Sequence, residues 1–108
     1  MNCVIYARVA RPEAAELRLL RFITFCRSYA EQEGLGVVGE FRDVGSGITL
    51  DRPDLTALRC IIAQDSIDVV LVYTLSQLTR SGWHREILCG EFARQGTKLY
   101  LVSRRKVM

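Results

Sequence analysis

A chain of 108 residues, of which 49% are hydrophobic and 25% charged, has the composition of one folded domain with its own core, which excludes a disordered chain. The net charge of +3 and the pI of about 8.8 are a mild indication of a polyanionic partner. No apolar run approaches the roughly 20 residues of a membrane span, and the N-terminus lacks a signal-peptide pattern. We therefore expect a cytoplasmic protein without a membrane partner.

The first half of the chain predicts two strands around one helix. Residues 2–9 are typical of a strand buried on both faces, and residues 35–41 of a second strand. Between them, residues 12–33 carry apolar side chains at spacings of three and four, which predicts a helix. The helix stripe that should face the core is Leu19, Phe22, Ile23, Cys26, Tyr29 and Ala30. The Gly-Ser-Gly stretch at 45–47 predicts a mobile loop with no packing partners.

The second half repeats the alternation of helix and strand. Its predicted elements are a helix starting at Asp51-Arg52-Pro53, a central parallel strand at 67–73, a helix at 83–95, a last strand at 98–103 and a short basic tail at 104–106. The order βαβαβαβ predicts an α/β fold: one three-layer domain with a parallel sheet, helices on both faces and right-handed crossovers, flavodoxin-like in broad terms.

The cysteines Cys3, Cys26, Cys60 and Cys89 lie far apart in apolar patterns and form no Cys-x-x-Cys pair. We therefore expect four buried free thiols. His84 is the only histidine, and no ligand spacing fits zinc, so no metal site is predicted.

The ends of parallel strands predict where a functional site lies, because open α/β sheets bind ligands at the carboxyl edge. Three arginines from separate segments should meet there and form an anion site. An isolated arginine is more often a solvated surface residue, but the joint placement favours a site. The residues expected at this edge are Arg8, Ala10, Ser46, Arg52, Ser76, Gln77 and Arg80. No glycine-rich nucleotide motif accompanies them.

Five motifs follow one another along the chain: Tyr6-Ala7-Arg8-Val9, Asp43-Val44-Gly45-Ser46-Gly47, Arg52-Pro53-Asp54-Leu55, Ile67-Asp68-Val69-Val70-Leu71-Val72 and Leu75…Leu78-Thr79-Arg80-Ser81. Together they resemble the catalytic domain of serine recombinases, the resolvase/invertase family, over essentially the whole chain. The resemblance implies DNA cleavage and rejoining through a covalent phosphoserine link, with no metal or cofactor. It matches Arg8, Arg52 and Arg80 to family arginines that bind the phosphate.

The chain departs from this family at its chemical centre. The family places its serine nucleophile where this chain has Ala10, and it usually places an Asp-Arg pair where this chain has Ser76-Gln77. Phe22 lies where the family often has Gln. An alanine has no oxygen that can attack phosphorus, and the lost arginine weakens stabilisation of the developing charge.

These departures favour a recombinase-like domain of DNA recombination that does not cleave DNA and binds it weakly, without sequence preference. In the family, a dimerisation helix and a DNA-binding domain accompany the catalytic domain; we assign residues 1–108 to the catalytic domain alone. One alternative is an interaction protein that pairs with itself or with an intact recombinase, suggested by apolar residues off the helix stripe at Leu17, Leu20 and Phe25. Another is an active fragment that uses the hydroxyl of Ser46, Ser76 or Ser81.

Overall fold

A five-stranded sheet in the order β2-β1-β3-β4-β5 organises the chain in a computed structural model that describes residues 1–108. Neighbouring strands among the first four pair in parallel, and β5 pairs antiparallel with β4. The elements are β1 (Asn2–Val9), α1 (Ala15–Gln32), β2 (Gly36–Val44), α2 (Pro53–Gln64), β3 (Val69–Val72), α3 (Leu75–Leu78), α4 (Gly82–Arg94), β4 (Lys98–Leu101) and β5 (Lys106–Val107). None of the helices has the length and apolar character needed to span a bilayer.

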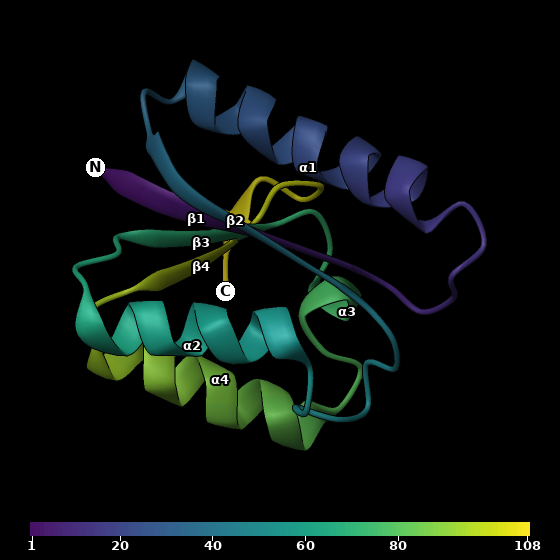
Figure 1. Cartoon of the computed structure of the whole chain (residues 1–108). Coiled ribbons are helices and arrows are strands. Elements are labelled where there is room, and N and C mark those ends of the chain that lie inside the picture. Colours follow the sequence, from purple (N-terminus) through teal and green to yellow (C-terminus); the bar gives the residue numbers. More distant parts are fainter.

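The sheet lies between two helical layers, with α1 on one face and α2 and α4 on the other (Figure 1). Two hydrophobic clusters fill the spaces between these layers. Val4 and Tyr6 of β1 belong to the cluster that includes α2 and α4 side chains, whereas Ile5 and Ala7 belong to the cluster under α1. Successive side chains of a strand point to opposite faces, so a strand covered on both sides needs an unbroken apolar run.

The predicted α/β fold with helices on both faces is confirmed, but the end of the chain differs from the prediction. The basic tail expected at 104–106 forms a turn and the short strand β5, in which Lys106 pairs with Leu101 and Val107 with Tyr100. Arg105 takes the left-handed conformation in this turn, with φ of 51°. The sheet is therefore mixed, because its last strand is antiparallel.

Two local expectations also need correction. Helix α1 begins at Ala15 rather than Pro12, because Ala14 adopts a left-handed conformation with φ of 52° that separates the helix from the preceding turn. Cys60 is exposed and Cys89 only half-buried, so the expectation of four buried thiols holds for Cys3 and Cys26 alone. Cys60 lies between the buried positions of α2 rather than on its core face.

Candidate functional site

Arg8 lies one residue before the end of β1 and points its guanidinium at backbone carbonyls rather than at solvent. Only 6% of this residue is exposed. Its Nη1 donates to the Gly45 carbonyl at 2.7 Å, Nη2 to Ser76 at 2.6 Å and Nε to Gln77 at 3.3 Å. Arg8 therefore ties the loop after β2 to helix α3, which follows β3.

Arg52 precedes α2 and is buried in the same way, with 3% exposed. It donates from Nε to the Thr49 carbonyl at 3.0 Å, from Nη1 to Tyr6 Oη at 2.9 Å and from Nη2 to the Leu78 carbonyl at 2.5 Å. Arg8 and Arg52 thus satisfy three successive carbonyls of α3, from residue 76 to 78. The last carbonyls of a helix lack partners within it, so the two arginines supply bonds that this four-residue helix needs.

The loop after β2 is held by hydrogen bonds, and the expectation that nothing packs against it was wrong. The Gly47 carbonyl accepts from the Arg80 backbone N–H at 2.8 Å and from Thr79 Oγ1 at 3.2 Å. A Cβ atom on Gly47 would lie 2.6 Å from Arg8 Nη2 and 2.8 Å from Arg80 Cγ. Glycine at this position therefore permits the close approach of two arginines, which the pattern Gly-Ser-Gly alone did not indicate.

Asp43 and Tyr6 form a buried polar pair that the sequence analysis did not single out. Asp43 Oδ2 accepts from Tyr6 Oη at 2.7 Å and from the Leu55 backbone N–H at 2.9 Å, and its Oδ1 accepts from the Asp54 N–H at 3.0 Å. Burial, followed by the bond to Asp43, raises the pKa of Tyr6 well above its ordinary value. The signal available in the sequence was a hydroxyl-bearing side chain between the apolar residues Ile5 and Ala7 of a buried strand.

A cavity of about 350 Å³ opens at the carboxyl edge of the sheet and contains most of the predicted site. Among the residues that line it are Arg8, Ala10, Ser76, Gln77 and Arg80. Neither Ser46 nor Arg52 lines this cavity. Arg52 instead lies buried against Tyr6 Oη and the Leu78 carbonyl. Its lining also includes Arg18 and Thr74, which the sequence analysis did not assign to the site.

The electrostatics of this cavity favour an anion. Burial lowers the pKa of Arg8, and the neighbouring charges of Arg52 and Arg80 act in the same direction. None of these three arginines forms an ion pair with a carboxylate, and no carboxylate or imidazole lines the cavity. An anion placed there would offset this accumulated positive charge.

Gln77 adds an amide without a partner. The residue is 5% exposed, and neither its Nε2 nor its Oε1 makes a hydrogen bond. A buried amide without partners costs free energy, so it is a candidate ligand group for whatever occupies the cavity. No cluster of three or more His, Cys, Asp or Glu side chains is placed to hold a metal ion.

Comparison with known proteins identifies this architecture. The family model "Resolvase, N terminal domain" matches residues 3–107. The C-terminal catalytic domain of ISC1926 TnpA, an IS607-like serine recombinase, superposes with a TM-score of 0.87 at 34% identity, over 94% of this chain and 67% of that chain. The N-terminal catalytic domain of TP901-1 integrase gives a TM-score of 0.80 at 27% identity, over 99% and 81% of the two chains. A search of curated proteins returned no match.

The C-terminal catalytic domain of IS1535 TnpA, another IS607-like serine recombinase, is also similar, with a TM-score of 0.74 at 29% identity over 94% of this chain and 70% of that chain. In these relatives the catalytic domain is thus described as either the N-terminal or the C-terminal part of its protein. The family model covers nearly the whole chain, and the fold and motif order agree with it. The chain therefore belongs to the resolvase family of serine recombinases and corresponds to its catalytic domain.

Proposed function

We propose that this chain is a serine-recombinase catalytic domain that binds the DNA backbone weakly and does not cut it. The observation that carries the proposal is the position of Ala10, which lines the cavity formed by Arg8 and Arg80. The family resemblance places the attacking serine at this position, and a methyl group cannot form a phosphoserine link. The arginines would then hold a phosphate beside a position without a nucleophile.

Weak binding follows from how the arginines are used. All three nitrogens of Arg8 already donate to protein carbonyls, and Arg52 does not line the cavity. Arg80 and Arg18 line it without side-chain hydrogen bonds or ion pairs, so they retain donors for a ligand. Binding that rests on a few phosphate contacts is independent of sequence and falls steeply with salt.

The test is incubation of the chain with supercoiled duplex DNA, followed by a denaturing gel that retains covalent protein–DNA species. The wild-type chain should give no covalent band. The single variant Ala10→Ser and the triple variant Ala10→Ser, Ser76→Asp, Gln77→Arg test whether the family residues restore cleavage. A covalent band with the wild-type chain would overturn the proposal.

The hydroxyl of Ser76 supports a second candidate, an active fragment with an unorthodox nucleophile. Ser76 lines the same cavity as Ala10, and its Oγ lies 3.1 Å from Thr74 Oγ1. No carboxylate or imidazole lines the cavity to activate this hydroxyl. Relaxation of supercoiled DNA by the wild-type chain, abolished by Ser76→Ala, would establish this candidate; relaxation by neither chain would exclude it.

The exposed apolar side chains of α1 support a third candidate, an interaction protein that modulates an intact recombinase. Leu17 is 69% exposed, Leu20 45% and Phe25 42%. Phe25 stacks on Tyr73 with ring centroids 4.9 Å apart, which extends the apolar surface toward the end of β3. Co-purification with a full-length serine recombinase, lost in the variant Leu17→Lys, Leu20→Lys, tests this role. A chain that remains monomeric and does not co-purify would exclude it.

A further inference from the structure

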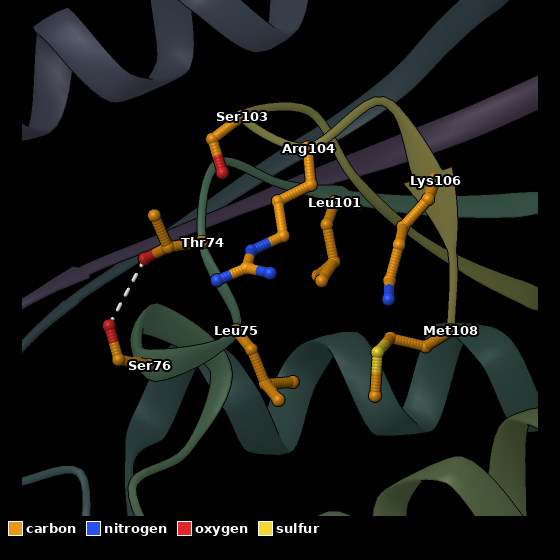
Figure 2. Close-up of a pocket in the computed structure, with 8 residues that line it drawn as sticks. All are labelled: Thr74, Leu75, Ser76, Leu101, Ser103, Arg104, Lys106 and Met108. Atoms are coloured by element: carbon orange, nitrogen blue, oxygen red, sulfur yellow. Dashed lines mark hydrogen bonds between the residues drawn. The ribbon is translucent and has the colours of Figure 1, made fainter.

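A second cavity, of about 400 Å³, lies at the carboxyl edge between α3 and the β4–β5 hairpin. Figure 2 shows the Arg104 guanidinium and the Lys106 ammonium directed into this cavity, beside the hydroxyls of Thr74, Ser76 and Ser103. In the sequence, these two basic residues belong to the predicted basic tail at 104–106. Pairing of β5 with β4 instead places both of them at one wall of a cavity.

The hairpin that carries these cations is anchored to the sheet. The Ser103 backbone N–H donates to the Tyr73 carbonyl at 3.0 Å, and the Arg104 N–H donates to the Leu101 carbonyl at 3.2 Å. Beyond β5, the Met108 N–H donates to the Leu99 carbonyl at 2.9 Å. These bonds fix the backbone on either side of Arg104 and Lys106, so ligand binding does not have to offset the conformational entropy of ordering this hairpin.

The chemistry of the lining suits a phosphate. Neither Arg104 nor Lys106 forms an ion pair, and no acidic side chain lines the cavity. A guanidinium and an ammonium supply charge-assisted bonds to phosphate oxygens, and hydroxyls donate to the remaining oxygens. Thr74 and Ser76 already contact each other, with their oxygens 3.1 Å apart, and one hydroxyl proton remains free to donate.

This cavity adjoins the one that contains Ala10. Thr74 and Ser76 line both cavities. The segment that contains these two residues therefore lies between Arg104 and Lys106 on one side and Arg8 and Arg80 on the other. Two adjoining cationic cavities fit a ligand that carries successive phosphates, which a polynucleotide strand does.

We propose that the cavity formed by Arg104 and Lys106 is a second phosphate site, which binds the DNA backbone next to the phosphate that Arg80 holds in the Ala10 cavity. This inference rests on the proposed function and extends it by assigning a track for the strand. The track runs from the Ala10 cavity across Ser76 to the β4–β5 hairpin. Its cations contribute affinity without contacting the position where the family has its nucleophile.

The first test measures DNA affinity by fluorescence anisotropy with a labelled duplex over a series of salt concentrations. The double variant Arg104→Gln, Lys106→Gln should bind about tenfold more weakly, as expected for lost charge-assisted bonds. The slope of log affinity against log salt should fall by about one, the loss of one neutralised phosphate. Arg105→Gln is the matched control, because Arg105 lies between the two cations but does not line the cavity. The single variant Arg104→Gln is compared with this control, since each removes one charge. If both single variants weaken DNA binding equally, the effect comes from diffuse positive charge and the site is overturned.

The second test uses inorganic phosphate alone and follows backbone amide shifts by NMR. Phosphate should shift the amides of Ser103 and Lys106, and the double variant should lose these shifts while those of Val9 and Ala10 persist. Shifts at Val9 and Ala10 without shifts at the hairpin would overturn the second site and leave the proposed function intact. Hairpin shifts without any effect of the double variant on DNA affinity would assign the cavity to small phosphates and overturn its role with DNA.

Discussion

Tyr6 on β1 donates a hydrogen bond from Oη to Asp43 Oδ2 on the neighbouring strand β2, at 2.7 Å. The same Tyr6 oxygen accepts from Arg52 Nη1 at 2.9 Å. A hydroxyl therefore links a buried carboxylate to a buried guanidinium that makes no direct ion pair with it. Since Asp43 also accepts from the first backbone N–H groups of α2, this link fixes the start of that helix against the sheet.

Removing the Tyr6 hydroxyl should destabilise the fold. We expect Tyr6→Phe to lower the free energy of unfolding by about 2 kcal/mol, because both Asp43 and Arg52 lose a buried partner. Urea denaturation measures this change. Tyr73→Phe is the control, since Tyr73 is only half-buried and its hydroxyl makes no hydrogen bond, and it should change the stability by less than about 0.5 kcal/mol. Equal stability of Tyr6→Phe and the wild-type chain would contradict this account of the link.

Gly47→Ala should be destabilising although the residue lies in a loop. Its Cβ would meet Arg8 Cζ and Arg80 Cγ, each at 2.8 Å, so the loop and α3 must move apart. We expect a loss of about 1–3 kcal/mol in the free energy of unfolding, the usual range for overpacking. Gly82→Ala is the matched control, because no atom lies within 4 Å of its added Cβ at the start of α4. That control should be neutral or slightly stabilising, and a neutral Gly47→Ala would show that the loop is not held as described.

Gln77→Met should separate stability from binding. The buried amide of Gln77 makes no hydrogen bond, so an apolar side chain of similar size should raise the free energy of unfolding by about 1 kcal/mol. If the amide contacts a bound phosphate, the same variant should bind DNA several-fold more weakly. Urea denaturation and fluorescence anisotropy measure the two effects. A variant that is both less stable and unchanged in binding would contradict the expectation.

The buried thiol of Cys26 should make the fold sensitive to alkali. Burial raises the pKa of Cys26 to about 12 from its ordinary value of 9.0. The unfolded chain therefore releases this proton first, and stability is present below pH 9 and is lost as the pH rises toward 12. We expect Cys26→Ala to reduce the fall in unfolding free energy between pH 9 and 10 by about 1 kcal/mol, because the unfolded thiol is only half deprotonated at pH 9. Cys60→Ala, which removes an exposed thiol, should follow the wild-type slope.

Hydrophobic periodicity was sufficient to predict the layers of this fold. The apolar run of β1 and the three-four spacing of α1 report directly on which faces are buried, because burial determines both patterns. The strand β5 was not predicted, because it consists of only two residues, Lys106 and Val107, and two exposed residues show no hydrophobic pattern. Helix α1 starts at Ala15 because Ala14 has a left-handed backbone. Alanine rarely adopts this conformation, so nothing in the sequence indicated it.

The candidate site was predictable only in its location. Placing Arg8, Ala10 and Arg80 at strand ends required the sheet rule alone, and the structure brings these three residues to one cavity. That Arg52 lies outside the lining could not be predicted, since its position depends on bonds to Tyr6, Thr49 and Leu78 from three other segments. The ordered conformation of the loop at 45–49 could not be predicted either, because the residues that bond to it, such as Arg8 and Thr79, are distant in sequence.

The capping of α3 by Arg8 and Arg52 bears on how this chain changes over time. Because both guanidinium groups donate to carbonyls of α3, the fold has a structural use for them whether or not a chain of this family cuts DNA. The presence of Arg8 and Arg52 is therefore weak evidence that a chain with this fold cuts DNA. The amide of Gln77 makes no hydrogen bond and the methyl group of Ala10 can make none, so the fold does not hold these two positions to one residue type in the same way.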